Sequence, residues 1–190
     1  MTVRELRLAD LATVLRIERA SFGKDSYSLA TFLAHLFRDR KGAFVAEDTE
    51  GEVVGYVLVR LSLGWLGPRR GGITSIAVAP AHRRRGIGSA LMARAMEFLR
   101  QHRAAEADLE VGVNNRAAHS LYESFGFRRA RVLPHYYGLN RDGLRMVLDL
   151  RASVPFNQPV ENQGSSRLQD EAAAPDQGCD TESARGGNGR

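Results

Sequence analysis

The sequence predicts one α/β domain with a mixed sheet, and three observations support this fold class. Short apolar runs of strand length alternate with segments of helical period over residues 1–151. Adjacent strand-like runs occur near both ends of that stretch, as β-hairpins require. The chain has 190 residues, of which 43% are hydrophobic and 26% charged, and this composition suits one domain with its own core.

The first half of the stretch predicts three strands and two helices. Residues 3–8 are expected to form a short strand. Asp10 is expected to cap a helix that starts at Leu11, and Ser28 a second helix with apolar residues at helical spacing up to residue 37. Strands at 43–47 and 53–61 should follow, joined by an Asp-Thr-Glu-Gly turn at 48–51.

The second half continues the alternation. A strand at 71–78 ends before Pro80, and a long amphipathic helix follows at 86–100, with Ile87, Leu91 and Ala95 on its inner side. The remaining elements are expected to be a strand at 107–113, a helix at 115–125 and strands at 127–133 and 144–150. The segment at 61–72, which contains Trp65, is expected to be a long surface loop or a contact for an acidic or ribosomal partner.

The composition changes after Leu150. Residues 152–190 are rich in Pro, Gly, Gln, Asn and Ser and poor in large apolar residues, so we expect a disordered tail; the alternative is a partner-binding or regulatory segment. Residues 1–151 carry a net charge of +8 and the tail −3. A basic domain suits a polyanionic ligand.

Several classes of protein are excluded by simple counts. The longest uncharged run, residues 71–82, is shorter than the ~18–20 apolar residues of a membrane helix, and the charged N-terminus lacks the pattern of an export signal. The single cysteine, Cys179, excludes an intramolecular disulfide and a cysteine-based zinc site, and the histidines show no metal-binding spacing. We therefore expect a cytoplasmic protein without a metal or a membrane partner.

The densest chemistry lies where the strand at 71–78 passes into the helix at 86–100. Three consecutive arginines precede Gly86 and Gly88, and the helix opens directly after them. Helix N-termini offer unpaired N–H groups to phosphate, and glycine lets an anion approach the backbone. The pattern is neither a Walker loop nor a dinucleotide fingerprint. The alternative is an ordinary turn with solvent-facing arginines.

The pattern Arg83-x-x-Gly86-x-Gly88 after this strand resembles the acetyl-CoA signature of the GNAT acetyltransferase superfamily. The resemblance implies a mostly antiparallel, splayed sheet flanked by helices, with the pyrophosphate on this turn and the pantetheine along the preceding strand. The cofactor-binding residues that it implies are Ile76, Ala77, Val78, Arg83, Arg84, Arg85, Gly86, Ile87, Gly88, Ser89, Asn115 and Tyr122.

Residues 109–127 are similar to the C-terminal half of the RimI-type ribosomal-protein-alanine N-acetyltransferases. That similarity implies that Glu110 is the general base, that Asn115 contacts the cofactor and that Tyr122 is the general acid. The roles are chemically consistent, because an attacking amine must lose a proton and a departing thiolate must gain one. The alternatives are a solvent-facing Glu110 and a Tyr122 that only packs. His119 is expected on the helix surface.

Two aromatic segments bear on the acceptor. Tyr136-Tyr137 resembles the element that N-terminal acetyltransferases place over a peptide, and Phe22 with Tyr27 resembles the loop that forms the other wall. Such walls would leave room for a small first residue, Ala or Ser. The alternative is that the tyrosines merely cover sheet edges.

The sequence thus predicts an acetyl-CoA-dependent N-acetyltransferase that acts on a protein N-terminus, with a ribosomal-protein alanine as the leading acceptor. The alternatives are a lysine or small-amine acetyltransferase and a non-catalytic acetyl-CoA-binding module. No direct nucleic-acid recognition is expected, because the arginine clusters lack an aromatic platform. We expect a monomer or a weak oligomer.

Overall fold

The computed structural model describes residues 1–38, 42–62 and 68–151. The strands are β1 (Thr2–Glu5), β2 (Ala43–Glu47), β3 (Val53–Ser62), β4 (Arg70–Val78), β5 (Glu106–Gly112), β6 (Arg128–Leu133) and β7 (Gly143–Asp149). The α-helices are α1 (Leu11–Phe22), α2 (Leu29–Arg38), α3 (Ile87–Gln101) and α4 (Arg116–Ser124). The prediction of a disordered tail at 152–190 concerns residues outside the described ranges.

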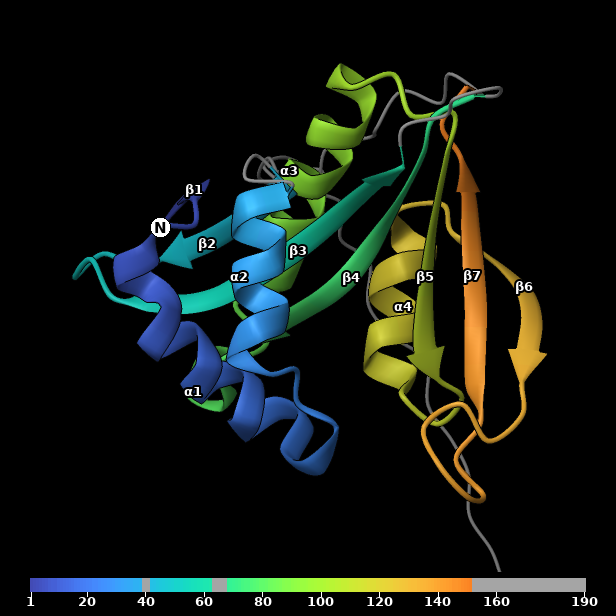
Figure 1. The fold of residues 1–190 in the computed structure, drawn as a ribbon, viewed down its shortest axis with the longest axis horizontal. Coiled ribbons are helices and arrows are strands. Elements are labelled where there is room, and N and C mark those ends of the chain that lie inside the picture. The colour runs from blue at the N-terminus through green and yellow to red at the C-terminus, as the bar shows by residue number, and fades with distance from the viewer. Residues whose placement is uncertain (39–41, 63–67, 152–190) are drawn as a thin grey trace, which may run out of the picture. The chain divides into compact units, whose positions relative to one another are not determined.

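The seven strands form one sheet in the order β1-β2-β3-β4-β5-β7-β6. Neighbouring strands run antiparallel except β4 and β5, which are parallel. Helices α1 and α2 cover one face, and α3 and α4 lie on the other (Figure 1). Alternate residues of β2 supply the two cores: Val45 packs toward α1 and α2, and Phe44 toward α3. The predicted mixed, mostly antiparallel sheet is confirmed.

The sheet opens between β4 and β5. The two strands pair only from Arg70 to Gly72, opposite Glu106 to Asp108, and then diverge (Figure 1). The register between β3 and β4 shifts at the same level, which leaves Thr74 as an extra residue in β4. Such a bulge bends a strand and increases its twist. It therefore turns the second half of β4 away from β5 and leaves an unpaired backbone edge along the opening.

An ion-paired cluster lies where the two strands part. Asp108 of β5 accepts hydrogen bonds from Arg60 of β3 and from Arg145 of β7. Arg60 must reach across β4 to do so, and the residue that it crosses is Gly72. A Cβ at position 72 would lie 2.4 Å from Asp108 Oδ1 and 2.6 Å from Arg60 Cζ. The ion pair between Arg60 and Asp108 passes directly over this position and therefore requires glycine there.

We expect Gly72→Ala to lower the free energy of unfolding by about 1–3 kcal/mol, because the added methyl group overpacks the cluster. Gly112→Ala at the other end of β5 is the control, since a Cβ there would meet nothing within 4 Å. Thermal unfolding of both variants checks the expectation. Equal melting temperatures for the two variants would contradict it.

Three local expectations were wrong. The first strand ends at Glu5 rather than at residue 8. The Asp10 carboxylate does not cap α1: it accepts the Arg7 N–H at 2.7 Å, in the 3₁₀ turn before the helix, and pairs with Arg4. The loop expected at 61–72 is shorter, because Ser62 pairs with Arg70. Trp65 lies outside the described residues.

The expectation for the second helix is confirmed in part. The Ser28 hydroxyl accepts the Thr31 N–H at 3.4 Å, and Phe32 is buried. Leu29 and Phe37 are exposed, although their spacing predicted that they would face inward. The predicted helix at 86–100 is confirmed, and its inner residues Ile87, Leu91 and Ala95 are buried.

Candidate active site

The turn before α3 has the geometry of an anion site. Gly86 precedes the helix with φ of 78°, in the left-handed region that favours glycine. Among the described residues, no side chain caps this helix, so the first N–H groups, at Ile87, Gly88 and Ser89, can serve a ligand. A Cβ at Gly86 would meet nothing within 4 Å, which leaves the approach to these groups open. These residues therefore fit a pyrophosphate.

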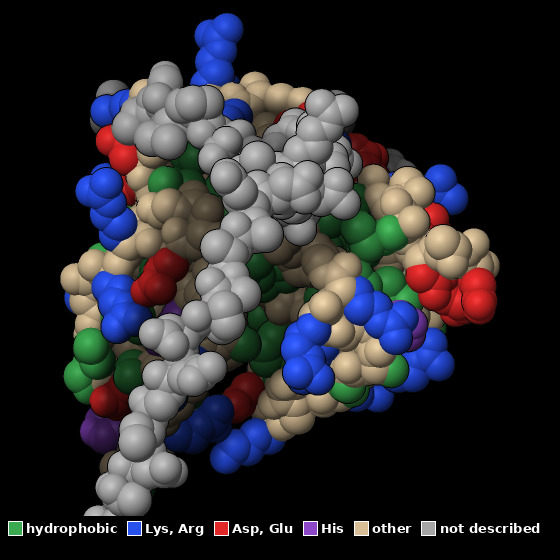
Figure 2. All heavy atoms as spheres, turned by 180° about the vertical axis from the view of Figure 1, so that it is seen from behind, with side chains coloured by type: hydrophobic (Ala, Val, Ile, Leu, Met, Phe, Trp, Pro, Cys, Tyr) green, Lys and Arg blue, Asp and Glu red, His purple; other side chains and the backbone are tan. Residues whose placement is uncertain are grey.

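The three arginines of the turn differ in what they contact. Arg83 donates from Nε to the Val78 carbonyl at 3.1 Å and from Nη2 to Ser21 Oγ at 3.3 Å, so it ties the turn to β4 and to α1. Arg84, with φ of 61°, and Arg85 are exposed. The face seen in Figure 2 carries Lys and Arg side chains around a hollow floored by hydrophobic ones. That combination suits a ligand with a charged and an apolar part.

The β4 residues expected to bind the cofactor line the opening. Ile76, Ala77 and Val78 pair with β3 on one side, and their other edge faces the gap toward β5. Ile76 and Val78 pack toward α3, whereas Ala77 is buried toward α1. An extended ligand can therefore hydrogen-bond to this edge in the manner of an added strand.

Glu110 and Tyr122 lie on the two elements beyond the opening. Glu110 is half-buried on β5, two residues past the last pair with β4 and on the same face as Asp108. Tyr122 of α4 is buried against Phe127, with ring centroids 6.1 Å apart. Burial raises the pKa of Tyr122 to about 12, so its phenol stays protonated at neutral pH. Among the described residues, that phenol has no hydrogen-bond partner, which leaves its proton available to a ligand.

The start of α4 was predicted in part. Asn115 is the N-cap, and its Oδ1 accepts the Ala118 N–H at 3.1 Å, which leaves the amide Nδ2 as the group that can contact a cofactor. His119 is buried rather than on the surface: it is 6% exposed, and its Nε2 lies 3.1 Å from the Gly112 carbonyl. The prediction for His119 was wrong because its position faces the end of β5, and the ring pairs with a backbone group there.

The tyrosines of the two predicted walls are all close enough to Glu110 to be affected by its charge. Burial raises the pKa of Tyr27, Tyr136 and Tyr137, and the negative charge of Glu110 raises each of them further. Tyr136 and Tyr137 contact each other edge-to-face, with ring centroids 4.9 Å apart. The structure thus places the two walls within electrostatic range of one carboxylate. Phe22 lies at the end of α1 and is 38% exposed.

A second ion pair joins the segments that carry these walls. Arg141, from the segment between β6 and β7, donates through both terminal nitrogens to the carboxylate of Asp25, which lies between α1 and α2. Bidentate pairs of this kind fix geometry as well as charge. No signal in the sequence linked these two residues, which are 116 positions apart.

Sequence reasoning also missed a buried carboxylate behind Tyr27. Glu18 of α1 is 1% exposed; its Oε1 accepts the Tyr27 N–H at 2.8 Å, and its Oε2 accepts the Tyr56 hydroxyl. Tyr56 is also 2.8 Å from the hydroxyl of Ser75 on β4. Glu18 therefore fixes the loop that carries Tyr27. The available signal was its place on the inner face of α1, where the other buried residues, Leu11, Val14 and Ile17, are apolar.

We expect Glu18→Ala to destabilise the protein by about 1–3 kcal/mol and to weaken peptide binding, because two buried donors lose their acceptor. Glu18→Gln keeps an acceptor oxygen at the same place and should be milder. Thermal unfolding and the peptide KM of both variants check this. Equal behaviour of the two variants would show that the carboxylate does not hold the loop.

Glu18 also predicts a pH dependence of stability. Burial raises its pKa above the ordinary value of 4.5, so the folded state keeps the proton at a pH where the unfolded state has lost it. The stabilisation from this group is therefore complete below about pH 4.5 and decreases as the pH rises through the folded-state pKa. Relative to Glu18→Gln, the parent protein should lose stability as the pH is raised from 4.5. Denaturant unfolding of both proteins over this pH range measures the difference. If the free energies of unfolding of the parent and of Glu18→Gln changed with pH in the same way, the expectation would be wrong.

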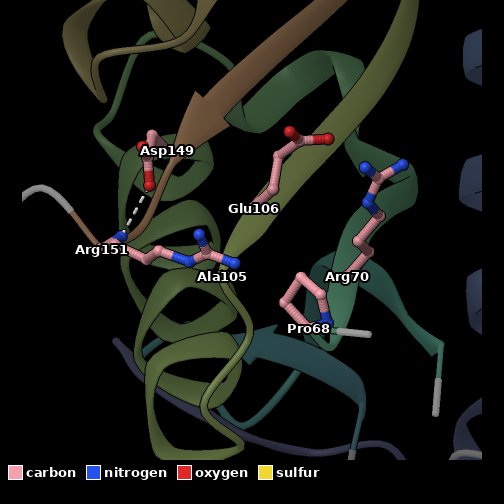
Figure 3. Close-up of a pocket in the computed structure, with 6 residues that line it drawn as sticks. All are labelled: Pro68, Arg70, Ala105, Glu106, Asp149 and Arg151. Carbon is pink, nitrogen blue, oxygen red and sulfur yellow. Dashed lines mark hydrogen bonds between the residues drawn. The ribbon is translucent and has the colours of Figure 1, made fainter. Parts of the chain in front are cut away.

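Among the hollows on the described surface, two lie at opposite ends of β5. The first, of about 260 Å³, is at the paired end of β4 and β5, away from the opening, and is lined by Pro68, Arg70, Ala105, Glu106, Asp149 and Arg151 (Figure 3). Its two arginines and two carboxylates balance in charge. The second, of about 340 Å³, adjoins the candidate site and includes Asn115 and Tyr137 in its lining.

Neither a metal centre nor a membrane span is evident in the described residues. No group of three or more metal-ligating side chains is found within the ranges that the structure covers. No helix of the described part is long and apolar enough to cross a membrane.

The sheet opens between β4 and β5, beside a turn that fits a pyrophosphate and a half-buried carboxylate, and comparison with known proteins identifies the class of protein. Residues 9–127 match the acetyltransferase (GNAT) family. The chain belongs to this family and is an N-acetyltransferase.

Three similar proteins illustrate the relationship. An N-alpha-acetyltransferase of Sulfurisphaera tokodaii is 34% identical over 156 residues, which covers 78% of this chain and 92% of that protein. A putative ribosomal protein bS18-alanine N-acetyltransferase of Bacillus subtilis is 29% identical, over 71% of this chain and 85% of that protein. The crystal structure of Chaetomium thermophilum Naa20 in complex with a bisubstrate analogue is similar with a TM-score of 0.71 and 28% identity, over 80% of this chain and 87% of that one.

Proposed function

We propose that this enzyme transfers the acetyl group of acetyl-CoA to the α-amino group of a protein N-terminus. The observation that carries the proposal is that the segments of Tyr27 and Tyr136 are joined by the Asp25–Arg141 ion pair near Glu110, beside an opening whose other edge is free backbone. The name of the Sulfurisphaera relative supports an α-amine as the acceptor, and that of the Bacillus relative supports a ribosomal-protein alanine as the leading candidate. With a ribosomal protein as acceptor, the enzyme would act in the cytoplasm.

The cofactor would be held by backbone more than by side chains. The N–H groups of Ile87, Gly88 and Ser89 would receive the pyrophosphate, with Arg84 and Arg85 adding positive charge. The free edge of β4 at 76–78 would pair with the pantetheine arm. The Asn115 amide would contact the same arm from the start of α4.

The chemistry would then be a direct transfer. The attacking amine becomes nucleophilic when Glu110 accepts its proton, directly or through a water. Backbone N–H groups near Val78 would stabilise the oxyanion that develops on the thioester carbonyl. As the C–S bond breaks, the protonated Tyr122 would donate its proton to the departing thiolate. No covalent enzyme intermediate is required.

The acceptor is tested with peptides that differ only in their first residue, each with a free and a blocked N-terminus. The proposal expects CoA release and a mass gain of one acetyl group with free Ala- or Ser-starting peptides. Blocked peptides of the same sequence should be inert. Transfer to a free small amine with no transfer to any peptide would contradict the proposal.

A further inference from the structure

The ion-paired cluster of Arg60, Asp108 and Arg145 lies where β4 and β5 part and also faces the acceptor side of the site. Arg60 and Arg145 each donate one hydrogen bond from Nη2 to Asp108, which is 8% exposed. Asp108 and Glu110 lie on the same face of β5, and Arg145 is directly opposite Glu110 in the pairing of β5 with β7. Two cationic side chains therefore flank the carboxylate beside which the acceptor amine would react.

The two arginines of this cluster have hydrogen-bond donors to spare. Both guanidinium groups share the single carboxylate of Asp108, and Glu110 beside them accepts no hydrogen bond from either one in the described structure. A guanidinium has five N–H donors, and each arginine uses one of them on Asp108. The side chains are 39% and 32% exposed, so both can be reached from solvent. The remaining donors are suited to a second carboxylate.

The arginines lie within range of both acceptor walls. The positive charge of Arg60 partly offsets the raised pKa of Tyr27 and of Tyr136, and Arg145 acts in the same direction on Tyr136. Tyr136 also packs over Gly143: a Cβ added at position 143 would lie 3.0 Å from the Cβ of Tyr136. Gly143 is two residues before Arg145 on β7. A peptide held between the walls would pass these two guanidinium groups within its first few residues.

We infer that Arg60 and Arg145 recognise a carboxylate near the start of the acceptor, so that the enzyme prefers N-termini in which Asp or Glu follows the acetylated residue. This inference rests on the proposed function, because it assumes a peptide acceptor in this cleft. The recognised group is a side-chain carboxylate, and the pair acts as a specificity determinant. Asp108 holds the two guanidinium groups in place for it.

The test uses three peptides with the same free Ala N-terminus and with Glu-Glu, Gln-Gln or Lys-Lys at positions two and three. We expect kcat/KM for the Glu peptide to exceed that for the Gln peptide about tenfold, as for one charge-assisted hydrogen bond, with the Lys peptide slowest. The ratio of Glu to Gln should fall toward one in Arg60→Gln and in Arg145→Gln. A ratio does not depend on the folded fraction, so partial destabilisation of a variant cannot imitate this result.

Arg129→Gln is the matched control, because Arg129 pairs with Glu123 of α4 on the exposed surface. It should keep the ratio of the parent enzyme. Equal kcat/KM for the Glu and Gln peptides, or a preference that survives both cleft substitutions, would overturn the inference and leave the proposed function intact. Absence of transfer to every free N-terminus would instead overturn the proposed function, and the inference with it.

Discussion

Glu110→Gln is expected to lower kcat by about 100-fold or more at neutral pH, the usual contribution of a positioned general base. The amide keeps the shape and polarity of the side chain but cannot accept the proton of the attacking amine. The KM for acetyl-CoA should change little, because the cofactor is held by the turn before α3 and by β4. Steady-state kinetics with a fixed peptide and each substrate varied in turn measures both quantities.

The pH profile sharpens this expectation. A peptide α-amine has a pKa of about 8, so above that pH the acceptor is already deprotonated and needs a base less. The deficit of Glu110→Gln should therefore shrink as the pH rises from 7 to 9. Glu106→Gln is the control, since Glu106 is on the same strand but lines the polar hollow at the paired end (Figure 3). An undiminished rate in Glu110→Gln across this range would remove Glu110 from the mechanism.

Gly86→Glu is expected to abolish detectable binding of acetyl-CoA, with at least a 100-fold rise in Kd. The substitution places a carboxylate beside the N–H groups that would receive the pyrophosphate, and it forces a Cβ onto a residue with φ of 78°. Isothermal titration with acetyl-CoA measures the Kd directly. Gly86→Ala separates the two causes, because it adds the Cβ without the charge.

Gly51→Glu provides a matched control for Gly86→Glu. Gly51 lies between β2 and β3 with φ of 85°, and a Cβ there would also meet nothing within 4 Å. The control therefore carries the same charge change and the same backbone strain at a place unrelated to the opening. It should bind acetyl-CoA like the parent. Equal loss of binding in both variants would mean that strain, and not the anion site, causes the effect.

The elements with strong local signals were predictable from sequence. The strand at 43–47 follows from a continuous apolar run, and the inner face of α3 follows from apolar residues at helical spacing. Both signals involve only residues close together in the sequence. The prediction that Asp10 caps α1 was wrong because both oxygens of its carboxylate accept hydrogen bonds from Arg4, six residues away. The prediction for Phe37 was wrong because its side chain, near the end of α2, is 79% exposed in the described structure although its spacing matches the inner face.

The residues of the candidate site also divide into those with a local sequence signal and those brought together only by the fold. Gly86, Glu110 and Tyr122 belong to short motifs, so the sequence alone is enough to propose them as site residues. Arg60, Asp108 and Arg145 could not be named in this way, because their contact depends on the register of four neighbouring strands, β3, β4, β5 and β7. Arg60 and Arg145 are 48 and 37 positions from Asp108 in the sequence. The opening itself depends on one unpaired residue in β4, Thr74, which leaves no signature in the periodicity of the strand.

The central claim is that the acceptor is an α-amine held beside Glu110, and one peptide tests it most directly. A peptide that begins with a free Ala and contains one internal Lys is incubated with the enzyme and acetyl-CoA, and fragment masses locate the acetyl group. The account predicts acetylation of the N-terminal amine alone, and the same result greatly slowed in Glu110→Gln. Acetylation of the lysine side chain, with the N-terminus left free, would contradict it.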